Sequence, residues 1–364
     1  MNDQEKNLTA ALLKLKALNL SSEQVKRVAV ASQGTLYIEI HEDEKQRYFV
    51  FEENKLSELL PENDSRIPLA SVLRKPGSMT NKAIISYRPG RRIVLGSVND
   101  KHVKISKGYK KLKSPKAAKN YAIAQSACEQ GGFDIPELLQ YETQSDCLVM
   151  ARRVGKAPVI ASDTIAIWER IGSCLRQFQS SYDARGLDGF SCRDELLVLD
   201  ERARRFLLCM SSLPGGWQAG RDRLETALIN LPAARLGLTH RDLHDGQLII
   251  AGSTVSLLDF DLICHADLAL DAGNLLAHMK LRTLQGQQGG DSSALTDCGK
   301  AFLFGLGRQH EPGFESRLLF YQASTFYRLA LLYALRPRWS HLAEPLIVEG
   351  NSCIDTFNQH RNHL

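Results

Sequence analysis

The chain changes its hydrophobic periodicity once, and this change constrains the fold more than any other feature. Before about residue 158, short segments alternate apolar and polar side chains, which is typical of β-strands. Beyond that point apolar residues recur at helical spacing, as Trp168, Leu175 and Phe178 do. One β-rich interruption, residues 236–263, lies within the helical part. The sequence therefore predicts an α+β protein with a β-rich first lobe and an α-rich second lobe.

The β-rich part divides into two groups of candidate strands. Three strands in residues 25–52 form a small sheet, and a mixed stretch with several prolines, residues 56–80, follows it. We therefore expect a β-rich subdomain in residues 1–80 that precedes the main fold. A further strand meander with one helix occupies residues 81–155, and residues 156–364 form the helical lobe.

The composition is that of an ordinary globular chain, because 43% of its 364 residues are hydrophobic and 24% are charged. The net charge of +5 is mild, although eight lysines gather in residues 101–119, a stretch without an acidic residue. The eight cysteines include no CxxC pair, so we expect reduced thiols. Neither a signal peptide nor a run of the ~20 apolar residues that span a bilayer is present. We expect a cytoplasmic protein without a membrane or nucleic-acid partner.

Polar residues gather at one end of the β-rich interruption. Residues 238–250 read LTHRDLHDGQLII, and after a turn residues 255–263 read VSLLDFDLI. Two apolar strands joined by a turn bring the residues before the first strand to the same end as those after the second. The polar residues expected at this end are His240, Asp242, Gln247, Asp259 and Asp261. Loops held between rigid strands often carry catalytic groups.

These residues resemble the aminoglycoside phosphotransferase and choline kinase superfamily, a relative of the protein kinases. The family's catalytic loop reads H-x-D-x-x-x-x-N, which His240, Asp242 and Gln247 match in spacing. Asp259 stands where the family keeps its magnesium-binding aspartate, and residues 267–271 look like its downstream D-P-A-x-D segment. The resemblance implies a bilobal, protein-kinase-like fold, preceded here by the extra N-terminal subdomain.

The resemblance also implies roles for the polar residues. Asp242 would accept or orient the proton of the attacking hydroxyl, and Asp259 would bind Mg²⁺ on the nucleotide phosphates. Gln247 would be the second metal ligand, although the family usually has asparagine there. Asp261 would either assist the metal or only cap a turn. The residues expected to brace the loop by hydrogen bonds are His240 and Asp271.

The first lobe supplies the nucleotide contacts that the resemblance implies. Lys104, in the expected strand of residues 101–105, resembles the third-strand lysine that contacts the α- and β-phosphates. Arg91 lies at a hairpin tip in the place of the loop that covers the nucleotide. Met150 and Arg152 stand in the segment whose backbone would meet the adenine.

The family's lysine normally pairs with a glutamate early in the following helix, and this chain departs from that pattern. Residues 116–125 contain no acidic residue, and Asn120 lies nearest the expected position. His244 replaces the lysine that protein kinases usually place two residues after the catalytic aspartate, and the segment of Asp259 lacks the D-F-G glycine. Both differences favour a small-molecule acceptor.

The function implied is transfer of the γ-phosphoryl group of ATP or GTP, with Mg²⁺, to a hydroxyl of a small molecule. Acids and bases are balanced in residues 182–235 and the first lobe is basic, which disfavours a cationic antibiotic. A sugar, a sugar derivative or another neutral or anionic metabolite fits better. The sheet before residue 80 resembles the cap of maltokinase-like proteins, which favours a sugar.

Two other functions are compatible with parts of this sequence. A metal hydrolase would use a ligand set made of His240, Asp242, His244 and Asp259. Apart from His265, however, the chain supplies no further histidine at ligand spacing. A kinase fold that has lost turnover and binds a nucleotide or a partner would explain Gln247 and the missing glutamate. The retained acids of the two polar segments speak against this second alternative.

Overall fold

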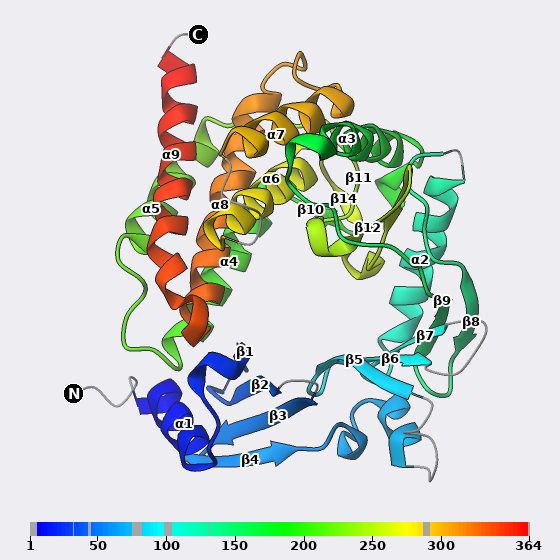
Figure 1. Ribbon diagram of the computed structural model, residues 1–364. Coiled ribbons are helices and arrows are strands. Elements are labelled where there is room, and N and C mark those ends of the chain that lie inside the picture. The colour runs from blue at the N-terminus through cyan, green and yellow to red at the C-terminus, as the bar shows by residue number, and fades with distance from the viewer. Residues whose placement is uncertain are drawn as a thin grey trace.

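The protein consists of two antiparallel sheets and a helical part (Figure 1). The computed structural model describes residues 6–31, 33–42, 45–74, 82–97, 104–129, 131–286 and 292–362. The predicted α+β architecture, β-rich at the N-terminal side and helical at the C-terminal side, is confirmed.

The first part is a four-stranded antiparallel sheet with one helix. Its elements are α1 (Lys6–Ala17), β1 (Val25–Val30), β2 (Leu36–Glu42), β3 (Lys45–Glu52) and β4 (Lys55–Leu59). The strands lie in sequence order, as consecutive hairpins do. Helix α1 was not predicted, yet Leu8, Ala11 and Leu15 are buried at helical spacing. Strand β4 lies in the stretch whose mixed composition hid it.

The second part is a five-stranded sheet of order β5-β6-β7-β9-β8, with one helix before β8. Its elements are β5 (Lys82–Arg88), β6 (Arg92–Ser97), β7 (Lys104–Tyr109), α2 (Ser114–Cys128), β8 (Leu138–Glu142) and β9 (Cys147–Ala151). The described part of the third strand, Lys104–Tyr109, overlaps the predicted segment of residues 101–105 at its last two residues, and residues 101–103 of that prediction lie outside the described residues.

The helical part has seven helices in the described residues, and five short strands interrupt it. The helices are α3 (Ile165–Ser180), α4 (Cys192–Leu207), α5 (Trp217–Ile229), α6 (Ala269–Leu284), α7 (Ser292–Leu306), α8 (Phe314–Ala334) and α9 (Ala343–Asn362). The strands are β10 (Gly189–Phe190), β11 (Leu236–Thr239), β12 (Leu248–Ala251), β13 (Thr254–Leu257) and β14 (Cys264–Asp267). None of the described helices combines the length and apolarity that crossing a membrane requires.

Close helix packing forms the core of this part. Helix α8 is at its centre and contacts α4, α5, α6 and α9. Helices α3 and α7 approach so closely that a Cβ on Gly172 would lie 2.0 Å from the carbonyl oxygen of Phe302. A Cβ on Gly305 would meet the carbonyl of Glu169 in the same way. Glycine is required at both positions because the backbones themselves are in contact.

The first sheet contacts both of the other parts (Figure 1). The guanidinium of Arg27 in β1 donates to the carbonyl oxygen of Tyr87 in β5, at 3.0 Å. On the other side, β1 lies against the 3₁₀ helix η8 (Pro337–Leu342) that follows α8. The side-chain amide of Asn7 in α1 also donates to the carbonyl of Leu208 at the end of α4. The first sheet therefore links the second sheet to the helical part.

Candidate active site

The hairpin of β12 and β13 brings the two polar segments to one end. Leu248 pairs with Leu257, and the N–H of Leu258 donates to the carbonyl of Gln247 at 2.9 Å. The end of the loop that leads into β12 and the start of the segment that follows β13 therefore lie side by side. This is the arrangement that the hairpin pattern of the sequence predicts.

Asp271, in the first turn of α6, holds the loop from beneath. Its two carboxylate oxygens accept hydrogen bonds from the backbone N–H groups of His240 and Arg241, each at 2.7 Å. The Nε2 atom of His240 donates to the carbonyl of Leu258 at 2.8 Å, which ties the loop to the strand opposite. Asp271 is fully buried, and this burial raises its pKa. The hydrogen bonds expected of His240 and Asp271 are thus present.

Two residues of these segments have left-handed backbone conformations that non-glycine residues rarely adopt. The φ angle is 68° at Arg241 and 64° at Asp259. At Arg241, contacts offset the cost of this conformation. Asp271 accepts a hydrogen bond from the backbone N–H of Arg241, and the guanidinium of Arg241 lies 3.6 Å from the ring centroid of Phe190 in β10. Such conformations cluster at functional sites, where neighbouring structure enforces them.

The acids after β13 face two basic residues of the second sheet. The Nζ of Lys107 lies 2.9 Å from Asp259 and 2.7 Å from Asp261. A guanidinium nitrogen of Arg92 lies 3.0 and 3.1 Å from the same two carboxylates, and the hydroxyl of Tyr109 donates to Asp261. Burial acts to raise the pKa of Asp259, but Lys107 and Arg92 outweigh it and hold that pKa well below its ordinary range. Asp259 is therefore ionised.

The structure corrects the lysine that we predicted for this side of the site and adds an arginine next to Arg91, whose predicted contact with the nucleotide stays a prediction. Lys104 is exposed at the start of β7, and Lys107 is the lysine that reaches the acids. Side chains alternate between the faces of a strand, so residues three apart point to opposite faces. In the hairpin, Arg91 is exposed at the turn, and Arg92 is the arginine that contacts the acids.

Asn120 of α2 occupies the place where a glutamate was expected. Its side-chain amide is buried and donates to the backbone carbonyls of Phe260 and Asp261, at 3.3 and 3.1 Å. Helix α2 therefore binds the backbone of the acidic segment. Lys107 pairs instead with the carboxylates of that segment. Asn120 was singled out by position alone, and a neutral side chain gave no signal of this contact.

The remaining residues predicted from the first lobe lie around the connection to the second lobe. Met150 is half-buried in β9 and pairs with Ile105 of β7, and Arg152 is exposed directly after that strand. Neither side chain contacts the acids of the site through an interaction found in the described residues.

Asp242 has a half-buried carboxylate that makes no hydrogen bond or ion pair within the described part of the chain. It lies close enough to Arg88 and Arg202 to stabilise the charge of both. A carboxylate without a protein partner is available to accept a proton from a bound molecule.

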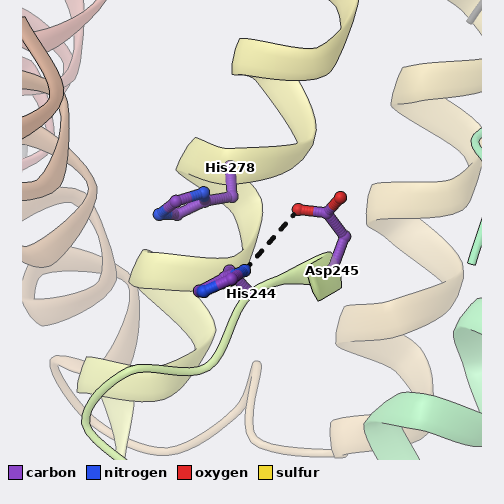
Figure 2. Close-up of side chains that lie close together, drawn as sticks. All are labelled: His244, Asp245 and His278. Atoms are coloured by element: carbon purple, nitrogen blue, oxygen red, sulfur yellow. Dashed lines mark ion pairs between the residues drawn. The ribbon is translucent and has the colours of Figure 1, made fainter. Parts of the chain in front are cut away.

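His244, Asp245 and His278 form a second cluster beside the loop (Figure 2). The two imidazole rings stack with their centroids 4.8 Å apart, and burial lowers the pKa of both. Arg282 binds the carboxylate of Asp245 at 2.8 and 3.1 Å, and Nδ1 of His244 accepts from the N–H of Gly246. The ligand atoms of Asp245 and His244 Nδ1 thus have protein partners, whereas Nδ1 of His278 is buried without a hydrogen-bond partner among the described residues. We interpret the cluster as a support for the loop, because Arg282 and the stacked rings fix His244 and Asp245 in place.

Oxygen donors for a divalent cation are present at the end of the hairpin. Asp259 and Asp261 offer carboxylates, and the amide oxygen of Gln247 has no protein partner among the described residues. The Nε2 of Gln247 lies 3.4 Å from Nε2 of His244. Carboxylate and amide oxygens suit Mg²⁺, and the low pKa of Asp259 keeps one of them charged. The donor set therefore fits the predicted metal.

Two lobes, a braced H-x-D loop and an acidic segment opposite a strand lysine define the class of kinase-like phosphotransferases. A model of the phosphotransferase enzyme family, APH, matches residues 105–299, which is more than half of the chain. The chain belongs to this family. A search of curated proteins found no match.

Solved structures share the fold at low sequence identity. A choline/ethanolamine kinase family protein from Mesorhizobium loti is 14% identical with a TM-score of 0.55, over 83% of this chain and 98% of that one. Amicoumacin kinase hAmiN, solved with AMP-PNP, Ca²⁺ and Ami, is 13% identical with a TM-score of 0.56, over 82% and 97%. Aminoglycoside phosphotransferase APH(3'')-Id from Streptomyces rimosus is 16% identical with a TM-score of 0.52, over 71% and 97%. The predicted kinase-like fold is confirmed.

Proposed function

We propose that the protein transfers the γ-phosphoryl group of ATP or GTP to a hydroxyl group of a small molecule. The observation that supports this most is the convergence of the H-x-D loop and the acidic segment opposite Lys107. The family match and the fold point to the same chemistry. Phosphoryl transfer depends on positioning and on neutralising charge, which is what these residue types provide.

Each residue has a role in this proposal. Asp242 orients the acceptor hydroxyl and takes its proton as the oxygen attacks. Lys107 and Arg92 bind phosphate oxygens of the nucleotide in place of their present carboxylate partners. Mg²⁺ would be held by Asp259 and Gln247 and, on the same side, by Asp261. When bound, it would neutralise the charge of the phosphates.

The acceptor that we propose is a sugar or sugar derivative, and the rival is a kinase fold that binds nucleotide without turnover. The experiment is nucleotide consumption by the purified protein, measured with ATP and GTP across a panel of sugars, sugar phosphates, amino alcohols and aminoglycosides. We expect acceptor-dependent turnover with a member of the sugar group. Turnover with amino alcohols or aminoglycosides alone would refute the sugar assignment, and nucleotide binding without turnover throughout the panel would favour the rival.

Replacement of Lys107 tests which of the two lysines of β7 binds the nucleotide. We expect Lys107→Met to raise the KM for nucleotide by roughly 10- to 150-fold, because charge-assisted hydrogen bonds contribute about 1.5–3 kcal/mol. Lys104→Met is the matched control, since Lys104 is exposed on the same strand and makes no contact with the acids. Steady-state kinetics with each nucleotide measures both variants. Equal effects of the two substitutions would contradict the assignment of Lys107.

A further inference from the structure

We propose that Asp64 is a positioning residue for the nucleotide, because it holds the β5–β6 hairpin in the place from which Arg92 reaches the phosphates. The inference rests on the proposed function and deepens it, since it gives the segment between the first two sheets a part in nucleotide binding. This connecting segment, residues 60–74, lies outside residues 105–299, which the family model matches.

The β5–β6 hairpin has two faces with different partners. Side chains alternate between the faces of a strand, so Tyr87 and Arg88 point to opposite sides. Tyr87 pairs with Ile93 across the hairpin, and both are buried in an apolar cluster with side chains of the 3₁₀ helix η3 (Pro68–Arg74). The pair of Arg88 and Arg92 therefore lies on the other face, where Arg92 contacts the acidic segment. The connecting segment supports the hairpin from the side opposite the site.

The carboxylate of Asp64 binds the tip of this hairpin. One of its oxygens accepts from the backbone N–H of Gly90 at 2.5 Å and from the hydroxyl of Tyr87 at 2.9 Å, and the other accepts from Nε of Arg66 at 2.9 Å. The side chain is only 3% exposed. Burial acts to raise the pKa of Asp64, but the guanidinium of Arg66 and the N–H of Gly90 outweigh it and lower that pKa. The carboxylate is therefore ionised, and its hydrogen bonds to the hairpin are of the strong, charge-assisted kind.

The tip extends beyond the strand that would otherwise hold it. Arg92 pairs with Tyr109, which is the last residue of β7, so the turn of residues 89–91 lies past the end of that strand. Beyond this pair, the backbone N–H of Lys110 donates to the carbonyl of Arg91 at 2.8 Å. The contacts of Asp64 add an anchor on the turn itself.

The position of Arg92 depends on the backbone of the hairpin. Its Nε is shielded from solvent and has no hydrogen-bond partner among the described residues, and its Nη1 contacts Asp259 and Asp261. In the proposed function a phosphate replaces these two carboxylates as the partner of Arg92. The guanidinium must then be in place before the nucleotide arrives, and a misplacement of about 1 Å can cost roughly a hundredfold.

Nucleotide binding to the full-length protein tests this role without any turnover. A non-hydrolysable ATP analogue with Mg²⁺ is titrated by calorimetry into the wild type, Asp64→Asn, Arg92→Met and the double variant. We expect Asp64→Asn alone to weaken binding by about tenfold, and to have little further effect in the Arg92→Met background, because residues that act through one another are not additive. Glu62→Gln is the matched control, since it removes a charge from the same segment and the side chain of Glu62 makes no hydrogen bond or ion pair with the described residues.

Tyr87→Phe is a milder second variant. It removes one donor to Asp64 but keeps the ring, which packs edge-to-face against Tyr48 with the centroids 4.9 Å apart. We expect a smaller loss of affinity that also disappears in the Arg92→Met background. Thermal unfolding shows which variants are folded, and the cycle with Tyr87→Phe decides the question if Asp64→Asn is not.

The outcomes separate this inference from the proposed function. Analogue binding by Asp64→Asn equal to that of Glu62→Gln would overturn the inference, and so would an equal loss with and without Arg92→Met, because a general loss of structure does not depend on Arg92. Turnover is measured separately with the acceptor panel. A wild type that binds the analogue but transfers no phosphoryl group would refute only the proposed function.

Discussion

Asp242→Asn is expected to lower the rate of acceptor-dependent phosphoryl transfer by about 10²- to 10⁴-fold, the usual contribution of a general base. An amide of the same shape cannot take the proton of the attacking hydroxyl. The carboxylate makes no hydrogen bond or ion pair in the described residues, so the substitution breaks no contact that holds the loop. We therefore expect the loss in kcat, with little change in the KM for nucleotide or in the melting temperature.

Steady-state kinetics with the best acceptor, together with thermal unfolding, measures this result. Asp222→Asn is a suitable control, because Asp222 is exposed on α5 and, among the described residues, its side chain accepts a hydrogen bond only from Gln218 of the same helix. A variant at position 242 that keeps the wild-type kcat would contradict the role of Asp242 as the base.

Asp259→Asn is expected to have an effect of similar size, a loss of roughly a thousandfold or more in kcat/KM. Removing this carboxylate removes a charged metal ligand, and charge stabilisation by a bound cation contributes several kcal/mol. It also removes one of the two carboxylates shared by Lys107 and Arg92. We expect nucleotide binding to lose its dependence on Mg²⁺, which calorimetry with and without the cation measures directly.

Two further measurements sharpen the test of Asp259. Asp261→Asn should cost less if Asp261 only assists, because Asp259 still balances Lys107 and Arg92. The pKa of Asp259 is held below the ordinary value of an aspartate. Its carboxylate is therefore still charged at a pH equal to that ordinary value, and the charge is lost only at lower pH, near the depressed pKa. Mg²⁺ dependence should therefore not weaken from protonation of Asp259 between about pH 5 and 8. Unchanged Mg²⁺ dependence in Asp259→Asn would contradict a metal role.

The residues after and before the β12–β13 hairpin could be predicted because their positions follow from local spacing. A turn between two apolar strands fixes which residues share an end, so Asp242, Gln247 and Asp259 needed no knowledge of distant structure. The brace by Asp271 followed from the family pattern. These predictions depended only on the order and spacing of residues along the chain, and both can be read from the sequence.

The error at β7 arose because adjacent positions of a strand face opposite ways. Lys104 and Lys107 lie on the same strand but three residues apart, so their side chains point to opposite faces and only Lys107 reaches the acids. A run rich in lysine offered no signal of which lysine faces the second lobe, because the residue type is the same at each of these positions.

Helices α5 and α9 were not predicted from the sequence. Helix α5 packs against α8 and α9, and α9 packs against α8. The apolar face of each helix is therefore defined by elements that lie elsewhere in the chain, which local spacing does not reveal.

The first sheet has a consequence for how the two lobes move. A lobe attached by a single covalent connection can swing about it, but here α1 and β1 also bind the end of α4, η8 and the carbonyl of Tyr87. A body fastened at two separated points loses most of its rotational freedom. Movement of one lobe relative to the other must therefore either carry the first sheet along with one of them or break its contacts with the other.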